Sequence, residues 1–281
     1  DPREDPDWQR VSTALSNALS GLSVAARRAE LVSDDVANAM TETWAARDAR
    51  LAARGLSGGV EILEVVRRGD PELRARLRLA ESGAGAAAPQ ADAATRIADA
   101  FGGPGDAGAL AARAAAFGEA LSRLADTPES AALQADAVAT GGALASAFGV
   151  ASREIQAIRA KADDAAAVLV EDTNAALAEI ERLNAEIVRA EALGGGAARE
   201  LPALRDARDA EIDRIAAVLP VRTAARPGGA VALYAPGGAV LVDGPAARLS
   251  FARAPAMTPQ STFASGALSG VSIDGRPVSA A

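Results

Sequence analysis

The sequence predicts a mainly α-helical protein, made of long antiparallel, coiled-coil-like helices with a small β-rich subdomain near its C-terminal end. Its apolar content is 49%, yet aromatic residues make up only 3%, a balance that suits close helix–helix packing better than a thick globular core. Apolar residues recur at alternating steps of four and three over long stretches, which is typical of packed helices. After residue 220 the pattern changes to short runs separated by Pro-Gly-Gly turns, which predict strands.

The first helix is expected from about Ser12 to about Thr41, after a loose polar opening. Its apolar residues form a heptad seam, which consists of Leu15, Leu19, Leu22, Ala26, Ala29, Val36 and Met40. Such a seam packs lengthwise on other helices, and burying its large side chains contributes about 10 kcal/mol. Because a helix of this kind is marginal alone in water, we expect it to need a partner in this chain or in another.

The middle of the chain is expected to hold one strand and several helices. The run VEILEVVRR from Val60 predicts a strand. Asp70-Pro71-Glu72 then predicts a helix start, and that helix is either kinked or divided in two near Pro89. Further helices are expected over 110–124, over about 130–193, and through 204–219. The seam of the longest helix ends with Leu169, Ala176, Ile180, Leu183, Ile187 and Ala190.

Four short runs predict a meander of strands at the following positions: 221–225, 231–234, 240–243 and 249–253. The chain therefore divides into four expected parts. These are an N-terminal amphipathic helix (1–45), a helical domain with one short strand segment (46–220), a β meander (221–253) and a Pro/Ser/Gly-rich end (254–281) that we expect to be incomplete.

Composition argues against several classes of ligand and reaction. The net charge is −8 without a basic patch, which disfavours nucleic acid as a partner. The sequence has neither cysteine nor histidine, so thiolate and imidazole chemistry is absent. The missing thiols have two alternative explanations: compositional drift, or selection for export of the chain in an unfolded state. No apolar run is long enough for membrane insertion, and no signal peptide is visible.

The motifs that resemble catalytic or metal sites lack their partners. Gly55–Gly59 (GLSGG) matches a nucleophile elbow around Ser57. A serine nucleophile needs a base to accept its proton, and this chain has no histidine to serve as that base. Asp163 and Asp164 are neighbours that point about 100° apart on a helix, so we expect a solvated surface there rather than a cation site. The run Arg205–Asp209 predicts a local lattice of weak ion pairs. We therefore predict no catalytic residue, no cofactor and no metal site.

The first helix resembles the N-terminal signature of bacterial flagellar axial proteins, in which a Leu-Ser-x-Ala-x-x-Gly-Leu opening precedes a Val-Ala-Asn-Ala-x-Thr block containing Asn38 and Thr41. Later segments narrow the resemblance to the hook-associated protein 1 family of hook–filament junction proteins, over roughly 12–244. These segments are VEILEVVRRGDPELRARLRLAE, ALAEIERLNAEIVRAE and the stretch beginning LPALRDARDAEIDRIAAVLP. The matching residues in the last two are Leu183, Asn184, Ile187, Leu204, Asp206, Arg208 and Asp209.

Two positions depart from the family pattern, which reads Asn-Val-Ala-Asn-Ala-x-Thr-x-Gly-Tyr. Asp35 stands at the first Asn, and Thr43-Trp44 stands at Gly-Tyr. We expect Asp35 to add a charge beside the seam. Family members also place a matching amphipathic helix at the C terminus, and we expect this chain to stop before it. The seam is then expected to be partly exposed or docked elsewhere.

The resemblance implies a non-enzymatic structural subunit of the flagellum, an adaptor at the hook–filament junction that self-assembles into a ring or tube. It implies hook protein, other hook-associated proteins and an export chaperone as partners. It also implies an extracellular location reached through the flagellar type III export channel without a cleaved signal peptide. The alternative is a coiled-coil scaffold or binding module that presents its β subdomain to a ligand.

Overall fold

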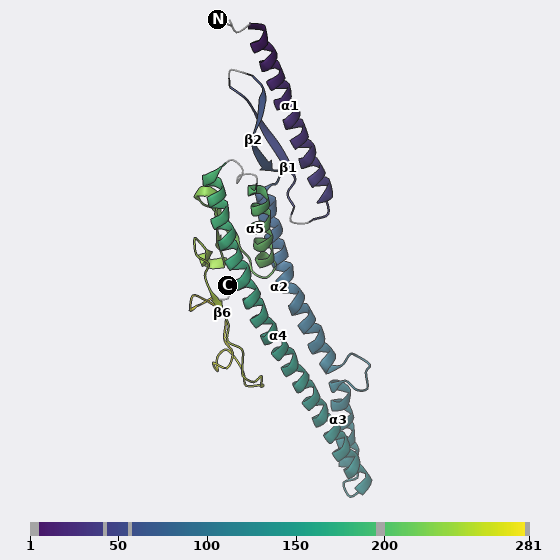
Figure 1. Cartoon of the computed structure of the whole chain (residues 1–281). Helices are drawn as coiled ribbons and strands as arrows, with labels where there is room; N and C mark the ends of the chain where they lie inside the picture. The colour runs from purple at the N-terminus through teal and green to yellow at the C-terminus, as the bar shows by residue number, and fades with distance from the viewer. Residues whose placement is uncertain (1–5, 42–43, 56–57, 195–199, 279–281) are drawn as a thin grey trace. The chain divides into compact units, whose positions relative to one another are not determined.

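The computed structural model describes residues 6–41, 44–55, 58–194 and 200–278, and it is mainly helical, as predicted (Figure 1). The helices are α1 (Pro6–Ala37), α2 (Pro71–Phe101), α3 (Leu110–Asp126), α4 (Ala131–Leu193) and α5 (Leu201–Ala216). The strands are β1 (Arg47–Ala53), β2 (Val60–Arg67), β3 (Arg222–Ala225), β4 (Val231–Tyr234), β5 (Val240–Val242), β6 (Leu249–Ser250), β7 (Ser272–Ile273) and β8 (Arg276–Pro277).

Several boundaries differ from the sequence prediction. Helix α1 already begins at Pro6, so the opening segment predicted to be loose is helical from there onward, because proline is well tolerated in a first helical turn. Helix α2 is one helix that contains Pro89. Strand β1, which pairs antiparallel with β2, was not predicted because its sequence RDARLAA has little β-branched character. The two-residue strands β7 and β8 were also missed.

The chain forms two compact units, to which both α2 and α4 contribute. The first comprises Asp1–Glu81 and Ala176–Ala246, and the second comprises Ser82–Ala175 and Ala247–Ala281. The four-part division expected from the sequence remains a prediction.

The main core of the first unit lies between α4, α5 and the sheet β3–β4–β5. Its fully buried large side chains are Leu177, Ile180, Leu183, Ile187, Ile212, Ile215, Leu233, Leu241 and Val242. The last part of the predicted α4 seam, from Ala176 to Ala190, is therefore buried, whereas Leu169 is exposed. We call α5, residues 176–193 of α4 and β3–β5 the body of this unit.

Helix α1 lies against the β1–β2 hairpin, and we call these three elements the N-terminal lobe (Figure 1). Val24 and Leu31 are the buried large apolar residues on this side of α1. The Oγ of Ser20 accepts a hydrogen bond from Val60 N at 3.1 Å. Gly58 and Gly59 allow this close approach: a Cβ on Gly59 would lie 2.8 Å from Ser20 Oγ, and a Cβ on Gly58 would lie 2.8 Å from Asn17 Nδ2. Gly58 and Gly59 of the GLSGG motif thus serve packing; Leu56 and Ser57 lie outside the described residues.

In the second unit, α4 holds the segment after residue 247 through polar side chains. Asn174 donates to Leu249 O at 2.9 Å and accepts from Leu249 N at 2.8 Å. Asp163 accepts a hydrogen bond from Ala254 N at 3.0 Å, and Asp164 pairs with Arg253. Asp164 is exposed, as expected of a solvated surface, and pairs with Arg253 there. The expectation was wrong for Asp163, which is half-buried and anchors an otherwise irregular segment.

We predict that Gly59→Ala weakens the packing of the hairpin on α1. The residue has a φ of +92°, and the added Cβ would meet Ser20 Oγ, so the opening free energy of the hairpin should fall by about 1–3 kcal/mol. Hydrogen exchange of the β1 and β2 amides measures this as an acceleration of roughly tenfold or more. Gly21→Ala is the control, because nothing lies within 4 Å of its Cβ position, and it should leave these amides unchanged or slightly slower. Equal exchange in both variants would contradict the prediction.

Candidate functional site

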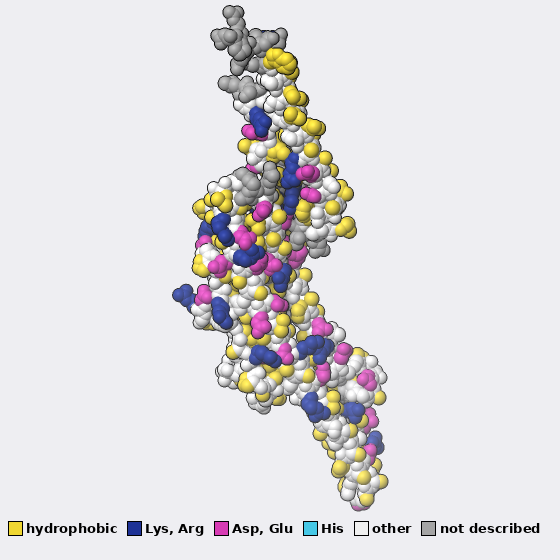
Figure 2. Space-filling view, in the orientation of Figure 1, with side chains coloured by type: hydrophobic (Ala, Val, Ile, Leu, Met, Phe, Trp, Pro, Cys, Tyr) yellow, Lys and Arg dark blue, Asp and Glu magenta, His cyan; other side chains and the backbone are white. Residues whose placement is uncertain are grey.

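The predicted seam lies on the surface of the single chain (Figure 2). Its large side chains are exposed over most of their area: Leu15 60%, Leu19 57%, Leu22 66%, Val36 72% and Met40 95%. Ala26 and Ala29 are exposed as well. An apolar stripe of this length on a protein surface marks a site of interaction with another chain or segment. Its role in subunit packing remains a prediction.

The seam and the packed side of α1 are nearly opposite faces of one helix. With about 100° between successive residues, Ser20, Val24 and Leu31 fall on the side away from Leu15, Leu19 and Leu22. The lobe therefore uses the more polar face of α1 for its own packing and leaves the apolar face free. This second face was not predicted, because a serine, a valine and a leucine among polar residues produce only a weak periodic pattern.

The end of α1 is shaped by the family-motif residues Asn38 and Thr41. Asn38 Nδ2 donates to Asp34 O at 2.9 Å, and the backbone of Thr41 donates to Asn38 O at 2.9 Å. Trp44 N then donates to Thr41 O at 3.0 Å. These residues form the turn by which the chain leaves α1, while Met40, between them, points its side chain to solvent.

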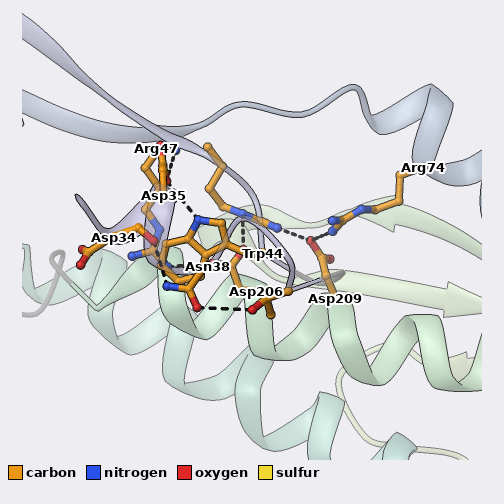
Figure 3. A network of polar contacts seen from close by, with 10 residues as sticks. Asp34, Asp35, Asn38, Trp44, Arg47, Arg74, Asp206 and Asp209 are labelled. Carbon is orange, nitrogen blue, oxygen red and sulfur yellow. Dashed lines mark hydrogen bonds and ion pairs between the residues drawn. The ribbon is translucent and has the colours of Figure 1, made fainter. Parts of the chain in front are cut away.

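Asp35 belongs to the packed side of the lobe and not to the seam, which corrects the expectation of a charge beside it (Figure 3). Its Oδ1 accepts a hydrogen bond from Trp44 Nε1 at 3.0 Å, and both its oxygens accept from Arg47 N at 3.2 and 3.1 Å. The two departures from the family pattern are thus bonded to each other. Thr43 lies outside the described residues.

A cluster of arginines and aspartates joins the lobe, the start of α2 and α5 (Figure 3). We call it the polar junction; it consists of Arg47, Arg67, Arg74, Arg78, Asp206, Asp209 and Asp213. The predicted lattice of weak local pairs on α5 is therefore wrong for the two family-motif aspartates Asp206 and Asp209, whose partners are far away in the sequence.

Asp206 and Asp209 each bind more than one arginine. Asp206 lies 2.8 Å from Arg47 Nη2 and 2.8 Å from Arg67 Nε, the latter as an ion pair without hydrogen-bond alignment. Asp209 Oδ2 lies 2.7 Å from Arg67 Nη2 and 2.7 Å from Arg74 Nη1. These side chains are largely shielded from water, so removing one partner costs more than breaking a surface pair.

The remaining family-motif residues lock α4 to α5 and β4. Asn184 donates to Val231 O at 2.9 Å and accepts from Val231 N at 3.1 Å, so its amide pairs with the strand backbone. Arg208 Nη1 donates to Asn184 Oδ1 at 3.1 Å and to Gly229 O at 2.8 Å. Leu183 and Ile187 flank this contact in the core. The structure thus brings Leu183, Asn184, Ile187 and Arg208 together around one strand.

Arg208 carries a buried charge next to neutral acceptors. Burial lowers the pKa of Arg208 to about 10, while the neighbouring Asp209 carboxylate acts in the opposite direction. At neutral pH the guanidinium remains charged, so its bonds to Asn184 and Gly229 offset the cost of burial.

The described residues show no arrangement suited to metal or membrane binding. Among them, no group of three or more carboxylates is placed to hold a metal ion. No helix in the described ranges is both long and apolar enough to cross a membrane. A cleft of about 360 Å³ lies beside the polar junction and is lined by Trp44 and Arg68 among others. Its arginines Arg67, Arg74 and Arg78 are already paired with aspartates.

Comparison with known proteins decides the family. The family model described as the flagellar hook-associated protein FlgK helical domain matches residues 94–274. The chain belongs to this family. The FlgK family is a structural one and not an enzyme family, in agreement with the predicted non-enzymatic class. The match includes Asn184, Asp206 and Arg208, whereas α1 and its seam precede the matched residues.

A solved structure shares the fold. The flagellar hook junction protein FlgK from Burkholderia pseudomallei superposes with a TM-score of 0.55 at 18% sequence identity, over 63% of this chain. The aligned part is 30% of the length of that FlgK chain. A comparison with curated protein sequences gave no match. The family match therefore covers the helical domain of the chain, and the chain spans less than a third of the length of the solved FlgK structure.

Asn184→Ala should destabilise the body. It removes both bonds to Val231 and leaves the buried Arg208 with one acceptor fewer, so we expect the free energy of unfolding to fall by about 2–4 kcal/mol. Urea denaturation followed by circular dichroism measures this change. Arg189→Ala, at an exposed position of the same helix, is the control and should change stability by less than about 0.5 kcal/mol. A similar small effect for Asn184→Ala would show that the amide is dispensable.

Asp35 and Trp44 should be energetically coupled. In a double-mutant cycle of Asp35→Ala and Trp44→Phe, we expect a coupling energy of about 1–2 kcal/mol, because the bond from the indole to the carboxylate is charge-assisted. Urea denaturation of the four proteins, followed by circular dichroism, provides the values. The cycle of Asp35→Ala with Trp8→Phe is the control, since Trp8 is exposed near the other end of α1. Additive effects in the Asp35–Trp44 cycle would show that the contact contributes nothing.

Proposed function

We propose that this chain is a structural subunit of the bacterial flagellum, an adaptor at the hook–filament junction that assembles into a ring or tube through the seam of α1. One observation carries the proposal: a chain with a FlgK helical domain leaves the apolar face of its N-terminal helix exposed. Packing through the seam at the hook–filament junction requires no reaction on a substrate, so the proposed role is non-enzymatic.

The energetics of the seam favour assembly with several neighbours over a single contact. Burial of Leu15, Leu19, Leu22, Val36 and Met40 contributes on the order of 10 kcal/mol. Association costs about 4–15 kcal/mol in lost motional freedom, so one seam contact alone is marginal. Ala26 and Ala29 allow close helix approach, and simultaneous contacts in a closed ring or tube would make the assembly stable.

The proposed partners follow from this role. We infer that sister subunits cover the seam, and that hook protein and other hook-associated proteins lie on either side of the ring. The proposed location is the extracellular flagellum, reached through the flagellar export channel with the help of an export chaperone. The absence of cysteine suits passage as an unfolded chain.

Substitution in the seam tests the proposal in the bacterium. Leu19→Glu places a charge in the middle of the seam, and we expect loss of swimming in soft agar together with release of unattached filament subunits into the medium. Arg28→Glu also adds an acidic residue to an exposed position of α1, but off the seam, and it should swim normally. Normal swimming and normal filaments in the Leu19→Glu strain would refute the seam as an assembly surface.

Sedimentation separates this role from a discrete coiled-coil scaffold. The mean mass of the junction subunit should rise steadily with protein concentration, or remain that of a monomer while neighbours are missing. A scaffold module would give one fixed dimer or trimer. A fixed oligomer that survives Leu19→Glu would therefore contradict the proposal.

A further inference from the structure

The boundary between the N-terminal lobe and the body is formed by charged side chains. The large apolar residues buried in the body come from α4, α5, β4 and β5, whereas the lobe buries Val24 and Leu31 within itself. Within the part of the chain that the structure describes, the ion pairs between the lobe and α5 are those of Arg47 and Arg67 with Asp206 and Asp209. The orientation of the lobe thus depends on directional polar contacts more than on apolar packing.

Arg47, the first residue of β1, contacts the end of α1, Trp44 and α5 (Figure 3). Its backbone N–H donates to Asp35 near the end of α1. Its guanidinium lies over the ring of Trp44, with Cζ 3.9 Å from the ring centroid, and donates to Asp206 of α5 at 2.8 Å. The stacked indole limits the positions that the guanidinium can adopt, so the contact transmits the position of α5 to the end of α1.

The three aspartates of α5 differ in what they hold. Asp206 binds two arginines of the lobe, Arg47 and Arg67. Asp213, two turns further along α5, binds Arg78 of α2 at 2.5 Å. Asp209 lies between them and binds arginines of both kinds. Asp206 and Asp213 therefore form a matched pair of carboxylates on one helix: Asp206 contacts the lobe, and Asp213 does not.

We propose that the Arg47–Asp206 contact, supported by Arg67 and by the Trp44 stack, is a latch that fixes the direction of α1 relative to the body in the single chain. Arg47 is its positioning residue. The latch concerns the orientation of α1 within one molecule, so it holds whether or not the seam serves in the flagellar junction. Without it, the lobe remains attached through the backbone on either side of the hairpin and takes several orientations.

Pulsed electron spin resonance distances between the lobe and the body test the latch. Because the chain has no cysteine, one spin label at Ala25→Cys on α1 and another at Ala185→Cys on α4 can be introduced without removing native thiols. Both positions are exposed. The doubly labelled chain is diluted with unlabelled chain, so that distances between molecules do not contribute.

The latch predicts different results for two charge-removing variants. In the parent chain we expect one narrow distance distribution. In Asp206→Asn we expect its width at least to double or a second peak to appear, while circular dichroism stays unchanged. In Asp213→Asn, which loses a carboxylate of α5 that does not contact the lobe, the distribution should remain as in the parent. An unchanged distribution in folded Asp206→Asn overturns the proposal, and so does equal broadening in Asp213→Asn.

Further measurements keep the test decisive if Asp206→Asn fails to fold. Arg47→Gln removes the same contact from the other side and carries the same expectation. In folded Arg47→Gln, broadening with unchanged circular dichroism supports the latch, and an unchanged distribution overturns it.

Discussion

The paired hydrogen bonds between Asn184 and Val231 are the contact on which the body of the first unit depends. The amide occupies the backbone N–H and C=O of β4, which fixes where that strand lies along α4. The side-chain oxygen of Asn184 also accepts a hydrogen bond from the buried guanidinium of Arg208, so the same side chain fixes the position of α5. The apolar residues around it add burial, but burial alone is non-directional and would permit β4 to slide along the helix.

Helix α1 resolves two demands by using opposite faces. One face packs on the hairpin through Ser20, Val24 and Leu31, and it relies on glycines in the turn to allow close contact. The other face carries the leucines of the seam and remains exposed in the single chain. Polarity alone would favour packing of the leucine face on the hairpin, so the packed face is selected by specific contacts, namely the Ser20–Val60 hydrogen bond and the close approach of Gly59.

Much of this structure could be predicted from the sequence. The helices and the seam follow from apolar periodicity, and the strands β3 to β6 follow from short apolar runs between Pro/Gly turns. The buried part of α4 from Ala176 to Ala190 lies where the periodic pattern places it. Strand β1 was missed because its residues carry little β propensity and are held by the partner strand. The polar junction was also out of reach: the run Arg205–Asp209 suggests short-range pairs, and nothing local indicates partners that lie more than a hundred residues earlier.

Asn174 and Asn184 have in common that each binds both backbone groups of one strand residue, Leu249 and Val231 respectively. A hydrogen bond to the main chain does not depend on which side chain the bonded residue carries. These bonds therefore place no demand on the side chains of the strands. Exposed strand positions can change over evolutionary time, whereas buried ones such as Leu233 and Val242 must remain apolar, provided that the two asparagines persist. The β segments of distant members of this family should then share few identical residues and still attach at the same points along the long helix.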